Sequence, residues 1–232
     1  ETIVVISPTG TGYVNYVFSE SVEYMSRGNC ASVTLQYSKR PSPMSLDRVP
    51  EGREQLRMLV MGINRELRKR PVSKRPRIVL FGESLGAWTS QEAFSGGGTD
   101  LMDAYNVSRA FWIGTPAGSK WAKQVLHQER YDTVKGQVAE FNDFGQYQKL
   151  TPSQKKNLRF VLCTHDDDPI PKFGVNLLVQ SPPWLKNGVE RAPTIPKNNH
   201  YRTPLTFVQT MVDMKNALKP VPGQFVAVGH DY

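Results

Sequence analysis

The feature that most constrains this sequence is a Gly-x-Ser-x-Gly motif that directly follows four apolar residues. Residues 78–88 read I-V-L-F-G-E-S-L-G-A-W, with Ser84 at the centre of the motif. The apolar run is typical of a buried strand, and the residues after the motif are typical of a helix. A serine in such a turn has a strained backbone that leaves room only for small neighbours, hence the two glycines. We interpret Ser84 as a nucleophile rather than as part of an ordinary strand-to-helix turn.

Around this turn, segments typical of strands alternate with segments typical of helices. Strands are expected at 2–7, 31–37, 77–81, 108–113, 158–164 and 224–228. Helices are expected at 13–27, at 51–70, after Ser84 and at 206–218, with a mixed and largely helical stretch at 119–157. Repeated strand–helix–strand units imply a mostly parallel sheet, here of about six strands, with helices on both faces. We therefore expect residues 1–232 to form a single α/β domain, a three-layer sandwich.

Composition narrows the class of protein. The chain is 39% hydrophobic and 22% charged, which is an ordinary globular balance. No apolar run approaches the roughly eighteen residues of a membrane span, so we expect this domain to be soluble. The two cysteines, Cys30 and Cys163, suggest neither a disulfide framework nor a metal site, and we expect no cofactor. The chain begins at Glu1 without a signal peptide, and we expect it to be a piece of a longer protein.

A net charge of +8 is partly concentrated in residues 65–77, R-E-L-R-K-R-P-V-S-K-R-P-R. The first interpretation of such a run is a solvated helix end. The second is contact with an anionic membrane surface, and nucleic acid is a weak third because no recognisable reading motif accompanies it. The run precedes the strand that leads to Ser84. We therefore expect it at the opposite edge of the sheet from the serine.

Other strand ends carry the remaining groups that a serine nucleophile needs. In a parallel sheet the site lies beyond the carboxyl ends of the strands. His230 directly follows the last expected strand, so we take it as the general base, with His200 as the alternative. Residues 164–169, T-H-D-D-D-P, supply the acid. We favour Asp168, because Pro169 fixes the turn after it, and keep as alternates Asp166 and Asp167.

An oxyanion hole is expected between the nucleophile turn and the first loop. One donor would be the backbone N–H of Leu85, directly after the nucleophile. The other would come from residues 7–12, S-P-T-G-T-G, whose glycines allow close approach of the backbone to a ligand. Pro8 has no N–H, which leaves Thr9 and Gly10 as candidates, and we take Thr9 as the second donor. A phosphate-binding loop is disfavoured because it lacks the lysine that such a loop needs.

With these elements the chain resembles the α/β-hydrolase superfamily in a minimal form. More narrowly, longer phrases resemble a bacterial family, common in actinobacteria, in which a multi-spanning membrane domain precedes a C-terminal α/β-hydrolase domain. The phrases include S-P-T-G-T-G-Y, F-G-E-S-L-G-A-W-T-S-Q and K-F-G-V-N-L-L-V-Q-S-P-P-W-L. The resemblance implies that this chain is the catalytic domain and that the full-length protein is membrane-associated through a missing N-terminal part. The chain departs from the superfamily pattern in one respect: we expect the first two strands of the superfamily sheet, and the helix after His230, to be missing from it.

We therefore expect a serine hydrolase that cleaves carboxylic esters through an acyl-enzyme. The membrane context of the family points to lipid-like acyl esters as substrate, and no nucleic acid is expected as partner. An acyltransferase with the same triad is the alternative, and a non-catalytic binding domain on a hydrolase scaffold is the second. The Pro-rich segment 181–201 is expected to border the site, with Trp184 and Leu185 as an acyl-binding wall, or to be a rigid surface loop. Trp121 is a further candidate for the pocket.

Overall fold

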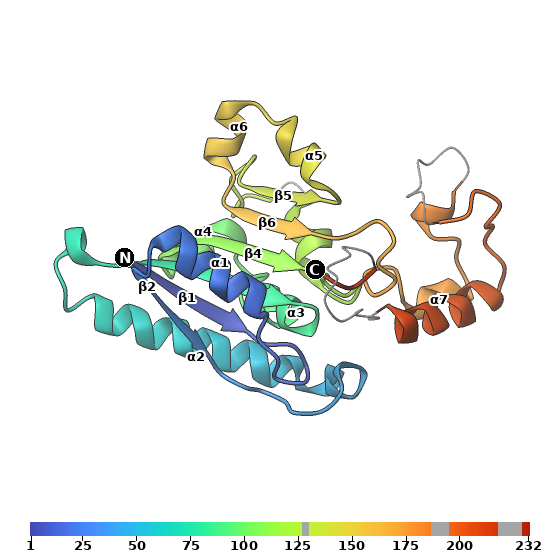
Figure 1. The fold of residues 1–232 in the computed structure, drawn as a ribbon, viewed down its shortest axis with the longest axis horizontal. Coiled ribbons are helices and arrows are strands. Elements are labelled where there is room, and N and C mark those ends of the chain that lie inside the picture. Colours follow the sequence, from blue (N-terminus) through green and yellow to red (C-terminus); the bar gives the residue numbers. More distant parts are fainter. Residues whose placement is uncertain (127–129, 187–194, 218–228) are drawn as a thin grey trace.

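Six parallel strands form one sheet in the computed structural model, which describes residues 1–126, 130–186, 195–217 and 229–232. The strand order is β2-β1-β3-β4-β6-β5, and every pairing is parallel. The strands are β1 (Thr2–Ser7), β2 (Cys30–Thr34), β3 (Arg77–Glu83), β4 (Val107–Ile113), β5 (Val138–Phe141) and β6 (Phe160–Cys163). Their carboxyl ends all point to one edge, on the right of Figure 1. The expected parallel α/β fold is thus confirmed.

Helices cover both faces of the sheet, and the alternation of side chains along the strands separates two apolar clusters. The helices are α1 (Tyr16–Ser26), α2 (Val49–Leu67), α3 (Leu85–Glu92), α4 (Gly98–Ala104), α5 (Phe144–Gln148), α6 (Pro152–Asn157) and α7 (Leu205–Asn216). Short turns add η1 (Ser42–Arg48), η2 (Val72–Lys74), η4 (Val175–Leu178), η5 (Pro183–Leu185) and the π-helical η3 (Ala122–Leu126). The larger cluster buries α2, α3 and α4 against one face, and α1 packs through Phe18 on the other.

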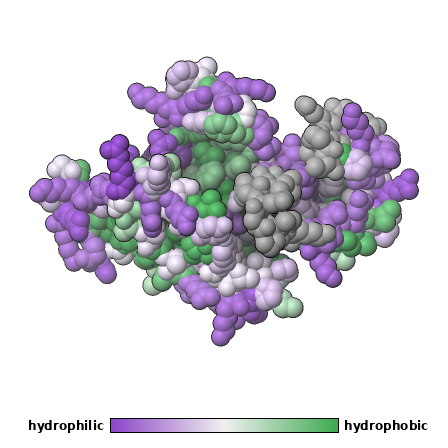
Figure 2. Space-filling view, in the orientation of Figure 1, coloured by the Kyte–Doolittle hydropathy of each residue, from purple (hydrophilic) through white to green (hydrophobic). Residues whose placement is uncertain are grey.

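The face that carries α1 is only partly covered by described residues. Phe18 of α1 stacks on Phe81 of β3 at a centroid distance of 3.6 Å. Farther along the sheet, Phe111 of β4 and its neighbour Val161 of β6 remain half-exposed on the same face. Figure 2 shows apolar side chains gathered there in a hollow below α5 and α6. Beyond the carboxyl ends of the strands lies α7, which projects away from the sheet (Figure 1).

Two expectations about the elements were wrong or incomplete. The stretch 119–157 was expected to be largely helical, but it contains the strand β5 at the edge of the sheet. With four residues, of which three are half-exposed, β5 has too short an alternation to identify from sequence. The second strand ends at Thr34 rather than at residue 37. The strand expected at 224–228 lies outside the described residues.

The basic run lies at the amino end of the strands, as expected from its position before β3. It covers the last turns of α2, the short η2 and the first residue of β3, Arg77, which is paired with Thr2 at the start of β1. Ser84 follows the other end of β3. The seven residues of β3 separate them, which is roughly 20 Å of extended chain.

Candidate active site

Ser84 occupies a strained turn between β3 and α3, where the two glycines of the motif are sterically required. Its backbone angles are φ 55° and ψ −122°, a combination that L-residues rarely adopt. A Cβ on Gly82 would lie 2.7 Å from the carbonyl oxygen of Gly86 and 2.8 Å from the Cα of Ala87. A Cβ on Gly86 would lie within 2.5 Å of the carbonyl oxygen of Pro8. The turn can therefore form only with glycine on both sides of the serine.

The turn places Ser84 directly before α3, and the backbone of Ser84 is hydrogen-bonded to the neighbouring strand β4. The Ser84 amide donates to the carbonyl of Ile113, at the end of β4, at 2.9 Å. Leu85 is the first residue of α3, so its amide has no acceptor within the helix. The positive end of the helix dipole thus lies beside the serine and favours negative charge there.

In the first loop, the two candidate oxyanion amides differ in their hydrogen bonds. The amide of Thr9 donates to the carbonyl of Tyr13 at 3.0 Å, so it is already used within the loop. Among the described residues, none accepts a hydrogen bond from the amide of Gly10. A Cβ on Gly10 would lie 3.1 Å from the Leu85 side chain, which places the two residues side by side. Of the candidate donors, Leu85 and Gly10 therefore have the better geometry.

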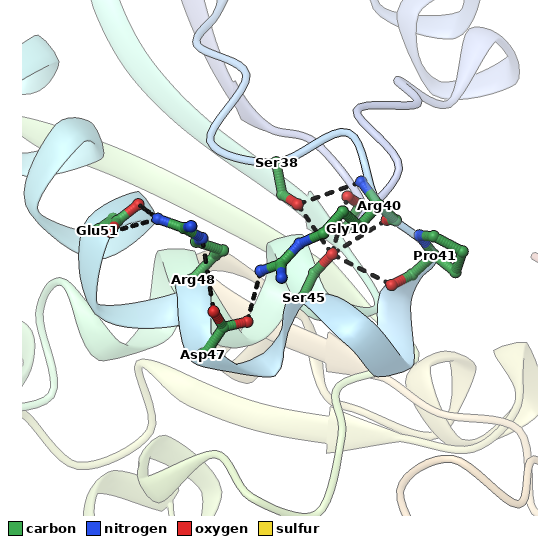
Figure 3. Close-up of polar contacts among 8 residues, drawn as sticks. All are labelled: Gly10, Ser38, Arg40, Pro41, Ser45, Asp47, Arg48 and Glu51. Atoms are coloured by element: carbon green, nitrogen blue, oxygen red, sulfur yellow. Dashed lines mark hydrogen bonds and ion pairs between the residues drawn. The ribbon is translucent and has the colours of Figure 1, made fainter.

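The buried hydroxyl of Ser45 ties the Gly10 loop to the segment before α2. Its Oγ lies 3.3 Å from the carbonyl oxygen of Gly10, 3.0 Å from that of Arg40 and 3.1 Å from that of Pro41. Figure 3 shows Ser45 at the centre of these contacts, with Ser38 beside it. The backbone also comes close, since a Cβ on Gly10 would lie 2.7 Å from the Cα of Ser42. Gly10 is thus held in place through its carbonyl while its amide stays available.

The structure brings Asp168 and His230 into direct contact. Asp168 is fully buried, His230 is 5% exposed, and the Nδ1 of His230 lies 2.7 Å from the Oδ2 of Asp168. The other ring nitrogen, Nε2, is buried without a hydrogen-bond partner among the described residues. The ring lies against Gly114, where a Cβ would be 2.6 Å from its Cε1. Gly114 directly follows Ile113, the residue that binds the Ser84 backbone, so His230 and Ser84 lie at adjoining strand ends.

Each of the three neighbouring acids has a different partner. Asp166 is exposed and accepts a hydrogen bond from the side chain of Asn142. Asp167 accepts from the backbone amide of Gly229 at 3.0 Å, and so holds the chain directly before His230. Asp168 alone contacts the imidazole, and its other oxygen accepts from the amide of Ile170 at 2.8 Å. Geometry therefore favours Asp168 over Asp166 and Asp167 as the orienting acid.

A fourth carboxyl group lies next to the nucleophile. Glu83, the residue before Ser84, accepts a hydrogen bond from the amide side chain of Asn15 at 3.1 Å. Burial raises the pKa of Glu83 above its ordinary value, whereas the Asn15 hydrogen bond and the nearby His230 act in the opposite direction. Asn15 also caps α1 by accepting from the amide of Phe18. This side chain therefore links α1 to the nucleophile turn.

Other residues expected at the site are not brought to it by any described contact. His200 is exposed in the loop before α7. Trp184 is half-buried and Leu185 is buried in η5, so their role as an acyl-binding wall stays a prediction. The expectation for Trp121 was wrong, because it is fully buried in the core, edge-on to Trp112 at 5.1 Å.

The described residues show neither a metal centre nor a membrane-spanning helix. In the parts of the chain that the structure describes, no group of three or more His, Cys, Asp and Glu could hold a metal ion. No described helix is both long enough and apolar enough to cross a membrane.

Sequence reasoning missed Tyr232, which contacts the acid–base pair directly. Its hydroxyl donates to the Oδ2 of Asp168 at 2.6 Å. In an extended chain, residues two apart point to the same side, so His230 and Tyr232 can both face Asp168. This spacing in G-H-D-Y was the available signal.

The chain is similar to a known protein family and to several solved structures. A family model described as an alpha/beta-hydrolase family matches residues 1–232. No curated protein sequence matches. Among solved structures, a cutinase-like protein from Cryptococcus sp. is 18% identical with a TM-score of 0.45, covering 73% of this chain and 78% of that one. An acetyl xylan esterase is 18% identical with a TM-score of 0.42, covering 73% and 84%. A lipase/esterase from Lactobacillus plantarum is 13% identical with a TM-score of 0.33, covering 71% and 79%.

Proposed function

The chain belongs to this alpha/beta-hydrolase family, and we propose that it is a serine hydrolase that cleaves carboxylic esters through an acyl-enzyme. The observation that carries the proposal is the hydrogen bonding of the two ring nitrogens of His230. Its Nδ1 lies on the buried carboxylate of Asp168, and its Nε2 is buried without a partner among the described residues. A buried polar atom without a partner is costly, and here it lies beside the end of the strand that binds Ser84. An imidazole so oriented is arranged to accept a proton through Nε2.

In the proposed reaction, the Ser84 hydroxyl attacks the ester carbonyl carbon while Nε2 of His230 takes its proton. Asp168 holds the ring in the tautomer with the proton on Nδ1 and stabilises the imidazolium that forms. The negative charge on the carbonyl oxygen is stabilised by the amides of Leu85 and Gly10 and by the start of α3. Collapse of the tetrahedral intermediate breaks the ester C–O bond, and the alcohol leaves with the proton from His230. Water then attacks the acyl-enzyme by the same route and regenerates Ser84.

We propose lipid-like acyl esters as the substrate class and a membrane-associated full-length protein. Both proposals come from the resemblance to a family with an N-terminal membrane domain. Exposed apolar residues of the described chain are compatible with such substrates. They include Leu205, Val208, Met211 and Val212 along α7, which lies on the same edge of the sheet as Ser84.

The proposal is tested first by labelling with a fluorophosphonate probe and mapping the modified peptide by mass spectrometry. The label is expected on Ser84 and is expected to disappear in Ser84→Ala, whereas Ser73→Ala, an exposed serine at the other end of the sheet, keeps it. Hydrolysis of short p-nitrophenyl esters should fall about 10³-fold or more in Ser84→Ala. Retention of most of this activity would falsify the assignment of Ser84.

The same assay distinguishes hydrolysis from acyl transfer. The unlabelled protein is incubated with an ester and a series of competing alcohols, and the products are identified by mass spectrometry. Free acid as the main product supports a hydrolase, whereas an alcohol-derived ester in excess over acid identifies an acyltransferase. A chain that neither labels nor turns over any ester is a binding domain on the hydrolase scaffold.

A further inference from the structure

Tyr232 and His230 contact the same oxygen atom of the Asp168 carboxylate. Oδ2 of Asp168 lies 2.6 Å from the Tyr232 hydroxyl and 2.7 Å from Nδ1 of His230. Oδ1 of the same carboxylate accepts from the amide of Ile170. Among the described residues, the fully buried carboxylate thus has three donors, two of them on the oxygen that faces the imidazole. Hydrogen bonds of this kind, to an ionised acceptor, are stronger than neutral ones.

The direction of the Tyr232 hydrogen bond follows from its other neighbour. The backbone amide of His165 donates to the Tyr232 oxygen at 3.1 Å, and an amide can only donate. The hydroxyl proton is therefore left for Asp168. Burial, and after it the charge of Asp168, raises the pKa of Tyr232 well above its ordinary value. The hydroxyl stays protonated wherever the protein is folded and active, so it remains a donor.

The ring of Tyr232 is held as firmly as its hydroxyl. It stacks on the ring of His165 at 4.3 Å, with an angle of 13° between the planes, and meets His230 edge-on at 5.7 Å. The same loop holds Gly229 through its carbonyl, 3.2 Å from Nδ1 of His165, and through its amide, bonded to Asp167. The loop 165–168 therefore contacts the chain on both sides of His230.

We propose that Tyr232 is a positioning residue of the active site: its hydroxyl keeps Oδ2 of Asp168 turned toward His230 and draws part of the carboxylate charge away from the imidazole. As far as catalysis is concerned, this inference rests on the proposed function. Two consequences follow. Without the hydroxyl, the carboxylate loses one of its three restraints, so the imidazole is less well oriented. The remaining negative charge on Oδ2 then faces His230 alone and favours its protonated form, which cannot act as a base.

The pH dependence of His230 has to be considered together with every charged group near the pair. On the acid loop these are Asp167, Asp168 and His165, and on the nucleophile turn it is Glu83, whose carboxyl interacts electrostatically with His230. Asp231 is the next residue along the chain, and Lys172 is half-buried close to the acids. Tyr232→Phe changes none of these charges and keeps the ring. A change in titration therefore reports the lost hydroxyl.

The test compares Tyr232→Phe with Tyr105→Phe. Tyr105 offers the same chemical change at the other end of the sheet, where its ring meets Phe94 edge-on at 5.8 Å. In Tyr232→Phe we expect kcat for a soluble ester to fall about 10-fold with KM nearly unchanged, because one hydrogen bond to an ionised group is lost. The acidic limb of kcat/KM should move to higher pH by about half a unit. Tyr105→Phe should leave both unchanged.

A second readout does not depend on activity. NMR of protein labelled with ¹⁵N in its histidine rings follows the titration of His230, which is assigned with the variant His230→Gln. The ring is expected to titrate at higher pH in Tyr232→Phe than in the unmodified protein. If the unmodified protein turns over no ester but this shift occurs, the proposed function fails and the role of Tyr232 stands. If the protein is an active esterase but neither the NMR titration nor the kinetic pH profile moves, the inference about Tyr232 is overturned and the proposed function stands.

Discussion

Gly86→Ala is expected to separate the two sides of the oxyanion site. In the structure, a Cβ on Gly86 would lie within 2.5 Å of the carbonyl oxygen of Pro8, and closer still to that of Ser7. Real Cβ atoms essentially never approach within 3.0 Å of such an atom, and the Ser7 oxygen would lie at 2.1 Å, so α3 or the first loop must move by about 0.9 Å. Both obstacles are backbone atoms, which no side-chain rotation can remove.

The movement falls on the groups that are proposed to stabilise the oxyanion. The Ser84 amide is bonded to Ile113 on one side, and Ser45 and Tyr13 hold the first loop on the other. Any displacement therefore changes the distance between the amides of Leu85 and Gly10. Misplacement of catalytic groups by about 1 Å costs about 10²-fold in rate, and overpacking costs about 1–3 kcal/mol in stability. We expect kcat in Gly86→Ala to fall by about 10- to 100-fold, with a lower Tm and a smaller effect on KM.

The assay is hydrolysis of a short p-nitrophenyl ester, together with thermal unfolding by circular dichroism. Gly62→Ala is the matched control, because Gly62 lies inside α2 and a Cβ there would meet nothing within 4 Å. Alanine is about 1 kcal/mol more favourable than glycine in a helix, so this variant should keep full activity and gain stability. Near-normal turnover and an unchanged Tm in Gly86→Ala would refute the steric reasoning.

Three further predictions follow from the same structure. Of Asp166→Asn, Asp167→Asn and Asp168→Asn, the change at Asp168 should lower kcat most, by about 10³- to 10⁴-fold, since it disturbs the tautomer of His230. Asp167→Asn should lower kcat little, because an amide oxygen can still accept from the Gly229 amide. A larger effect there would contradict the assignment of the acid. Replacing Lys69, Arg70 and Lys74 with Gln should leave soluble-ester turnover within about 2-fold of the unmodified protein, because these exposed residues lie at the amino end of the sheet. Binding to anionic vesicles, measured by sedimentation at low and high salt, then distinguishes a membrane contact from a solvated helix end. Burial raises the pKa of Tyr37 to about 12, so its phenol stays neutral in the folded protein, whereas in the unfolded chain it ionises near pH 10. The free energy of unfolding should therefore fall between about pH 10 and 12. Denaturant titrations of Tyr37→Phe should lack the part of this fall that comes from Tyr37.

The nucleophile turn could be predicted from sequence because its pattern of apolar strand, two glycines and helix is local. Gly82 is restricted by Gly86 and Ala87, a few residues along the chain. The steric reason for Gly86 is not local, because it lies in the carbonyls of Ser7 and Pro8 in the first loop. The parallel sheet was predictable for a similar reason, since long apolar runs such as β1 and β3 recur between helices. The short edge strand β5 carries no such run and was missed.

The choice among the three acids could not be made from sequence on physical grounds. All three lie in one turn, and what distinguishes them is a partner more than twenty residues away: Asn142, Gly229 or His230. The preference for Asp168 rested on Pro169, which fixes the turn but says nothing about these partners. The amide of Thr9 is a comparable case. Its residue type suits an oxyanion hole, and only the fold reveals that Tyr13 already uses it.

The two halves of the candidate site are held by different kinds of interaction, and this difference predicts how each would fail. The serine half is fixed by steric contact between backbones, at Gly82, Gly86 and Gly10, where any added atom must displace a chain. Such contacts cannot weaken gradually, so changes there should reduce stability and oxyanion geometry together. The histidine half is fixed by hydrogen bonds from one loop to a short segment around His230, and several of them involve titratable groups. Changes there can leave the fold intact and alter the protonation of the base, which is why pH dependence, rather than stability, distinguishes the role of Tyr232.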